Sequence, residues 1–190
     1  MGVRSRLVGV LAMTVLLAVP AFADTGEKSD PDDSPGVLDI ASVAHGHHFA
    51  FGRNKLEHTI TTQESWGLDD VNSNDSIQIE FQLPGDNRTS PPERLLVINV
   101  KNGELKAKLY NTLGDPPKFV ANVSLSRPDN RSVRVRFGKH LLRKHLKSYK
   151  YRVFTYYEKT GSDCNRPEAC QDATPDIGDS GNRVWIRHDL

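Results

Sequence analysis

The stretch LLVINVKNGELKAKLY (residues 95–110) decides the fold of this chain. In its second half Leu105, Ala107 and Leu109 alternate with polar residues, and this period of two is typical of a half-buried β-strand. The dipeptide Asn102-Gly103 lies between the two apolar runs, where Asn-Gly is a strong signal for a tight hairpin turn. The stretch therefore predicts an antiparallel β-hairpin over residues 95–109.

The same alternation recurs in other parts of the chain. In SIQIEFQL (76–83) the apolar residues fall on one face, and FVANVSL (119–125) and SVRVRF (132–137) repeat the pattern. Eight or nine such strands, with one short helix near residues 139–147, predict an all-β fold, a single antiparallel β-sandwich with a jelly-roll-like arrangement. The remaining predicted strands are LDIASV (38–43), LEHTITT (56–62), YKYRVFTYY (149–157) and RVWIR (183–187).

The first residues have the features of a signal peptide. Arg4 and Arg6 precede an apolar run, and Ala21-Phe22-Ala23 provides a cleavage site of small residues. We therefore expect residues 1–23 to be removed on export, residues 24–36 to be a disordered polar lead-in, and residues 37–190 to form one domain. No later segment predicts a transmembrane helix, so the expected location is secreted and extracellular.

The two cysteines of the chain, Cys164 and Cys170, lie close together near its C-terminus. An oxidising compartment favours a disulfide bond between them. Their spacing differs from the C-x-x-C pattern of redox-active pairs, so we expect a structural bond that fixes the loop between them.

Several stretches, taken in their order, resemble known secreted proteins. LDIASVAHGHH, LEHTITTQESW, IQIEFQL and SRPDNRSVRVRFGKHLL, followed by the tail with both cysteines, resemble a group of secreted actinobacterial proteins of uncharacterised function. The same order of strands is similar, more distantly, to β-sandwiches of the DOMON type and of family-nine carbohydrate-binding modules. The resemblance implies a noncatalytic sandwich that binds sugar or haem, and it assigns no individual binding residue.

A basic run without any acidic residue extends from Arg131 to Arg152. Such a run on a secreted domain predicts contact with an anionic polymer, such as a cell-wall or acidic polysaccharide. The alternative is the solvated face of an amphipathic strand, because its arginines alternate with apolar residues. Nearby aromatic side chains could stack on sugars or pack in the core. The predicted ligand-binding residues are Arg134, Arg136, Arg143, Lys144, Lys147, Tyr149, Tyr157 and Trp66.

Two other groups of residues are candidate metal ligands. On a strand His45 and His47 share a face, and His58 on the next strand could complete a zinc or copper site. The alternative is a polar strand edge, and a bulge at Gly46 would separate the two side chains.

In QDATPDIGDSGN (171–182) three aspartates, Asp172, Asp176 and Asp179, offer hard oxygen ligands beside Cys170. They predict a calcium site at 172–179, or else a plain exposed loop held by the disulfide. We expect no other cofactor.

The sequence has no motif that indicates catalysis, such as G-x-S-x-G, H-E-x-x-H or S-x-x-K. Loss of residues 1–23 removes two of the 25 Lys and Arg residues and none of the 24 Asp and Glu residues, so the overall charge stays near zero. We therefore expect a noncatalytic binding module that contacts an anionic extracellular polymer through its basic residues. The alternatives are a neutral carbohydrate-binding sandwich that uses Trp66 or Tyr157, and a metal-binding secreted protein.

Overall fold

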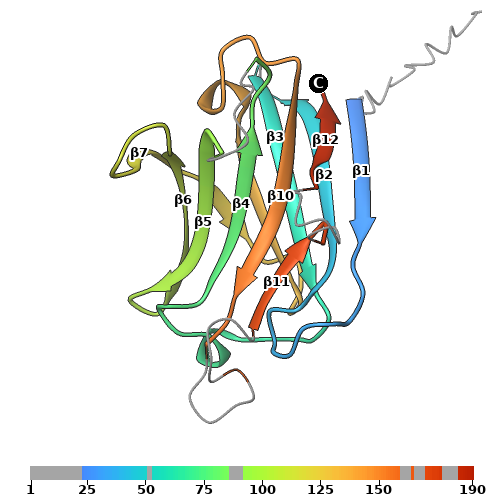
Figure 1. Cartoon of the computed structure of the whole chain (residues 1–190), viewed down its shortest axis with the longest axis vertical. Helices are drawn as coiled ribbons and strands as arrows, with labels where there is room; N and C mark the ends of the chain where they lie inside the picture. The colour runs from blue at the N-terminus through green and yellow to red at the C-terminus, as the bar shows by residue number, and fades with distance from the viewer. Residues whose placement is uncertain (1–22, 51–52, 86–91, 159–163, 165–169, 177–183) are drawn as a thin grey trace, which may run out of the picture.

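Two antiparallel sheets packed face to face form the protein in a computed structural model, which describes residues 23–50, 53–85, 92–158, 164, 170–176 and 184–190 (Figure 1). The predicted β-sandwich is therefore confirmed. The five-stranded sheet has the order β1-β2-β3-β9-β8. Its strands are β1 (Ala23–Ser29), β2 (Ile40–Ala50), β3 (Arg53–Thr62), β8 (Ser124–Ser126) and β9 (Ser132–Gly138).

The seven-stranded sheet has the order β11-β10-β4-β5-β6-β7, and β12 also pairs with β10. Its strands are β4 (Ser76–Gln82), β5 (Arg94–Lys101), β6 (Glu104–Asn111), β7 (Lys118–Asn122), β10 (Ser148–Tyr156), β11 (Gln171–Thr174) and β12 (Ile186–Asp189). Both 3₁₀ helices are short, η1 (Leu68–Asp70) and η2 (Lys139–Leu141).

The core lies between the two sheets and is built by the period-two alternation. On β3, Leu56 and Ile60 are fully buried, and on the opposite sheet Ile79, Phe81 and Leu109 are buried as well. The residues between them along each strand face outward, so one strand supplies both the core and an outer surface. Within the described ranges, no helix is long and apolar enough to cross a membrane.

The predicted hairpin is present. Strands β5 and β6 pair antiparallel from Arg94 with Asn111 to Lys101 with Glu104, which leaves a two-residue turn. Asn102 and Gly103 occupy that turn with φ angles of 55° and 74°. Two positive φ angles in succession are what a hairpin turn of type I′ requires, and Asn and Gly are the residues that adopt them most readily.

The expectation of a disordered lead-in over residues 24–36 is wrong. Residues 24–29 of this lead-in belong to β1, which pairs with β2 at the edge of the five-stranded sheet. An edge strand is held by backbone hydrogen bonds that any sequence can make, so the polar composition of TGEKS gave no sign of it. The short strand β11 was not predicted either.

Two other predictions need correction. The stretch FVANVSL does not form one strand, because it is divided between β7 in one sheet and β8 in the other, and Phe119 is exposed. The helix predicted near 139–147 is reduced to η2, which spans three residues. Because β1 and β11 were not predicted and FVANVSL forms two strands, the described part of the chain has twelve strands instead of eight or nine.

The turn geometry predicts a measurable cost for adding a side chain at Gly103. An alanine there must adopt a left-handed φ, so Gly103→Ala should lower the free energy of unfolding by about 1 kcal/mol in a denaturant titration. Gly114→Ala is the matched control, since Gly114 lacks a positive φ and its nearest neighbour would lie 4.0 Å from the new Cβ. Equal effects of the two substitutions would contradict the assigned turn.

Candidate functional site

A groove of about 850 Å³ lies over the outer face of the five-stranded sheet. Its floor is β2, where the outward residues Ser42, Ala44 and Gly46 are small. Longer side chains on the neighbouring strands form the walls, with Glu27 of β1 on one side and Glu57 of β3 on the other. The groove therefore results from a row of small residues between two rows of larger ones.

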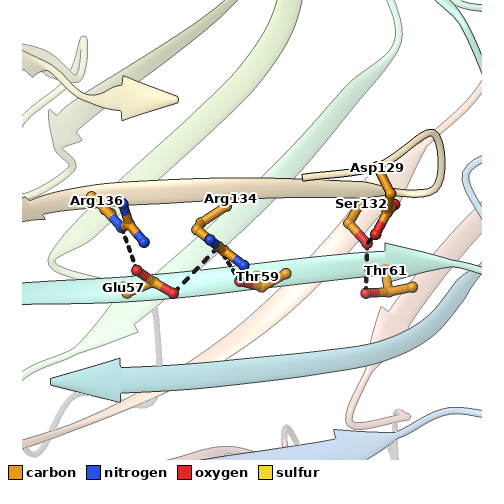
Figure 2. A network of polar contacts seen from close by, with 7 residues as sticks. All are labelled: Glu57, Thr59, Thr61, Asp129, Ser132, Arg134 and Arg136. Carbon is orange, nitrogen blue, oxygen red and sulfur yellow. Dashed lines mark hydrogen bonds and ion pairs between the residues drawn. The ribbon is translucent and has the colours of Figure 1, made fainter. Parts of the chain in front are cut away.

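The wall formed by β3 and β9 carries a network of polar contacts (Figure 2). Glu57 lies opposite Arg136 in the strand register, and its carboxylate accepts a hydrogen bond from Nε of Arg136. Its other oxygen is 3.3 Å from Nε of Arg134, which also donates to the Thr59 hydroxyl. One carboxylate thus holds two guanidinium groups side by side, so this group of three residues carries a net positive charge.

Hydroxyl groups account for much of the remaining groove surface. Further along the same wall, the Thr61 hydroxyl is 3.0 Å from that of Ser132, which donates to Asp129 (Figure 2). Thr25 and Ser42 line the groove from β1 and β2. Hydroxyls both donate and accept hydrogen bonds, so this surface matches a ligand that does the same.

Phe49 is the aromatic residue of the groove and is 65% exposed. The sequence does not distinguish Phe49 as a binding residue, because one aromatic residue near a strand end gives no distinctive pattern. An exposed aromatic side chain beside hydroxyl groups can pack against the apolar face of a sugar ring.

The aromatic residues predicted to bind a ligand are buried, so the prediction that they form surface contacts is wrong. Trp66 is buried, and the guanidinium group of Arg127 lies 4.0 Å from the centre of its ring. Tyr149 lies between the two sheets, and Tyr157 packs beside Gly36. None of these three side chains can act as a surface contact, because each contributes to the core.

The structure separates the predicted basic residues into two groups. Arg134 and Arg136 lie in the groove, whereas the exposed Arg143, Lys144 and Lys147 lie in the connection from β9 to β10 at one end of the sandwich. There Nη1 of Arg143 donates to the carbonyl of Pro84 at 2.6 Å. The basic run is therefore continuous in sequence but covers two different surfaces.

The three histidines proposed as metal ligands share the inner face, as alternation predicts. The β2–β3 register runs without a bulge through Gly46, so His45 and His47 both point inward, and His45 lies opposite His58. Among the described residues, however, the groups with ligand atoms close enough to share an ion consist of aspartates alone. The histidines are spread through a layer of rings and do not surround one point.

That layer of rings is a hydrogen-bonded network between the sheets. Nδ1 of His45 is 2.9 Å from the Tyr151 hydroxyl, and Nε2 of His58 is 2.9 Å from the Tyr149 hydroxyl. The Tyr149 hydroxyl is also 2.7 Å from Nδ1 of His188 on β12. Burial is the main reason why the pKa of His58 lies well below its usual value. Any positive charge on His188 or His45 lowers this pKa further.

The tail residues predicted to bind calcium are only partly together. Asp172 is a buried residue of β11, Asp176 is exposed just after it, and Asp179 lies outside the described residues. The predicted disulfide joins Cys164 to Cys170, directly before β11. Besides Asp176, the partners of Asp172 are three aspartates between β1 and β2. Asp30 and Asp33 fall in the lead-in expected to be disordered, and Asp39 falls in the predicted strand LDIASV.

Comparison with family models, with curated proteins and with solved structures finds no match to this chain.

The buried His58 predicts a loss of stability in acid. Below the ordinary histidine pKa of 6.5 the unfolded chain binds a proton at this side chain, whereas the folded protein does not. The free energy of unfolding should therefore fall by about 2 kcal/mol more between pH 7 and pH 5 in the wild type than in His58→Phe. The exposed His145→Ala serves as the control and should keep the wild-type pH dependence, measured by urea titration at each pH. A His58→Phe variant with the wild-type acid sensitivity would contradict this assignment.

Proposed function

We propose that the protein is a secreted, noncatalytic binding module that holds an anionic polysaccharide in the groove of the five-stranded sheet. The observation that supports this most directly is the wall of the groove, where Glu57 holds Arg134 and Arg136 side by side. The leader-like residues 1–23 and the Cys164–Cys170 disulfide support an extracellular location.

The shape and chemistry of the groove favour a saccharide chain. Its volume lies within the roughly 300–1,000 Å³ range of protein ligand sites, and it is open to solvent along a sheet face. Hydroxyls of Thr25, Ser42, Thr59 and Thr61 can exchange hydrogen bonds with sugar hydroxyls. Phe49 adds an apolar surface for a sugar ring.

The two arginines favour acidic groups on that chain. Their contacts with Glu57 run through the Nε atoms, so the terminal amino groups can donate to a carboxylate or phosphate of the ligand. Glu57 fixes the guanidinium groups in place before binding, which reduces the conformational entropy lost on association.

A neutral carbohydrate is the second candidate ligand. Glu27 and Glu57 together balance the charges of Arg134 and Arg136 over the groove as a whole. A neutral chain could bind to the same hydroxyls without any net electrostatic attraction. Salt dependence separates the two candidates, because screening weakens the contacts of a charged polymer and leaves those of a neutral one.

Removing the two groove charges tests the site. The double variant Arg134→Gln/Arg136→Gln should bind an anionic polymer such as polygalacturonate at least about tenfold more weakly, since two charge-assisted hydrogen bonds are lost. The double variant Arg143→Gln/Lys144→Gln removes the same charge from the end of the sandwich and should bind within about twofold of the wild type. Affinity electrophoresis at low and high salt, with a neutral β-glucan in parallel, measures both effects.

The results of this experiment separate the alternatives. Loss of binding only in the second double variant would transfer the site to the connection between β9 and β10. Salt-resistant binding of the β-glucan, lost in the groove variant, would favour the neutral ligand. No binding of any saccharide polymer would overturn the proposal.

A single substitution at Glu57 tests the sign of the charge effect. Glu57→Gln keeps an oxygen that accepts hydrogen bonds from the guanidinium groups but removes the opposing charge, so affinity for polygalacturonate should rise by about threefold at low salt. The free energy of unfolding should change by less than about 1 kcal/mol, because the ion pairs are partly exposed. Unchanged affinity for the anionic polymer would contradict direct contact with the arginines.

A further inference from the structure

Five aspartates from two distant parts of the chain meet at one end of the sandwich. They form two groups of three, Asp30 with Asp172 and Asp176, and Asp33 with Asp39 and Asp172. In each group the three carboxylate oxygens lie within 4.8 Å of one another. Asp172 belongs to both groups and is the centre of the cluster.

Backbone contacts of β11 place Asp172 against the segment between β1 and β2. One carboxylate oxygen accepts from the Ile40 amide and the other from the Ala173 amide, each at 2.6 Å. The Ser34 hydroxyl donates to the carbonyl of Gln171 at 3.2 Å. These contacts connect the two sheets at the cluster, since β2 belongs to one sheet and β11 to the other.

The disulfide and Gly36 hold the same region. Cys170 directly precedes β11, and its partner Cys164 packs under Gly36. Gly36 has a φ of 110°, and an added Cβ would lie 2.5 Å from the Tyr157 ring and 2.9 Å from Sγ of Cys164. The segment that carries Asp33 and Asp39 is therefore seated closely against the stapled tail.

Asp39 is buried, unlike the aspartates of an ordinary acidic surface. It is only 4% exposed, and no N–H or hydroxyl group of the described chain donates a hydrogen bond to either of its carboxylate oxygens. The polar groups next to it are the carboxyl groups of Asp172 and Asp32.

No ion pair joins any of the five carboxylates to a Lys or Arg of the described chain. A buried charge without a partner is costly, and several carboxylates together increase that cost by mutual repulsion. The unpartnered oxygens and the crowding indicate that a positive charge is needed at this place.

We propose that this cluster binds a calcium ion between Asp33, Asp39 and Asp172, with Asp30 and Asp176 as acidic neighbours of Asp172 outside the inner set. Two oxygens on one calcium ion are separated by at most about twice the metal–oxygen distance, which is roughly 5 Å. The separations among Asp33, Asp39 and Asp172 meet this limit. Water supplies the remaining positions of a six- to eight-coordinate ion.

The donor set favours calcium over other metals. All the side chains that converge here are aspartates, which offer oxygen, and both nearby cysteines are in the disulfide. Hard oxygen ligands suit calcium and magnesium, whereas zinc and copper favour nitrogen and sulfur. Magnesium requires a more regular octahedron and keeps more of its water, so a crowded group of carboxylates suits the larger ion.

A bound ion would connect the two sheets at this end of the protein. It would tie the Asp30–Asp39 segment to β11, in addition to the contacts of Ser34 and Ile40 with that strand. A ligand that binds only the folded state raises the free energy of unfolding. The site is separate from the groove, so it holds whether or not the groove binds a polymer.

Metal titration of the chelator-treated protein tests the proposal. Calcium at millimolar concentration should raise the unfolding temperature, and isothermal titration should give a saturable binding curve, with magnesium weaker by at least about tenfold and zinc without effect at this cluster. The absence of any calcium effect on the wild type would overturn the proposal. A zinc effect larger than that of calcium would overturn it too.

Substitution of single ligands locates the ion. Asp39→Asn and Asp172→Asn should each abolish the calcium-induced shift, and Asp33→Asn, at an exposed position that tolerates substitution, should weaken calcium binding by at least about tenfold. Asp69→Asn, an exposed aspartate of η1, is the control and should keep the full shift. Without metal, Asp39→Asn should unfold at a higher temperature than the wild type, because the substitution relieves repulsion. A calcium shift that persists in all three cluster variants would overturn the assignment.

Discussion

Each side chain of a β-strand belongs to one face of its sheet, and this constraint divides the protein into core and groove residue by residue. On β3, Leu56, His58 and Ile60 face inward, whereas Glu57 and Thr59 face outward. A shift of the register by one residue would bury the ion pair of Glu57 and expose the core. The stability of the sandwich and the geometry of the groove therefore depend on the same strand pairing.

The connections between the sheets distribute the charged residues unevenly. Exposed cations lie where β9 leads into β10, beside the first residue of β10, and the aspartate cluster lies near its last residue, where β11 pairs with it. Nine residues of extended strand separate these two ends by about 30 Å. A nearly neutral overall charge thus conceals a molecule that is basic at one end and acidic at the other.

The histidine–tyrosine layer shows how the core accommodates polar groups. The Tyr149 hydroxyl lies within hydrogen-bond distance of both His58 and His188, so one phenol group bridges two buried imidazoles. Such a network fixes the relative position of the two sheets through directional bonds, which apolar contacts alone do not provide. The aspartate cluster differs from it, because all its members are carboxyl groups and no basic side chain of the described chain lies among them.

The sequence by itself determined the features that depend on neighbours along the chain. Alternation predicted most of the strands and the shared face of His45 and His47, and Asn102-Gly103 predicted its hairpin. Close spacing in sequence likewise predicted the Cys164–Cys170 disulfide. These features are local because side-chain direction, turn geometry and a short covalent loop all involve residues a few positions apart.

Only the tertiary structure decided which distant residues meet. Strand pairing buried Trp66 and Tyr149, brought Glu57 to Arg136, and placed Asp39 beside Asp172, more than one hundred positions away. Two factors set these pairings. One is hydrogen bonding between backbones, which does not depend on side-chain identity, and the other is the burial of the whole inner face. The pattern of one segment therefore cannot reveal whether an aspartate will face water or four other carboxylates.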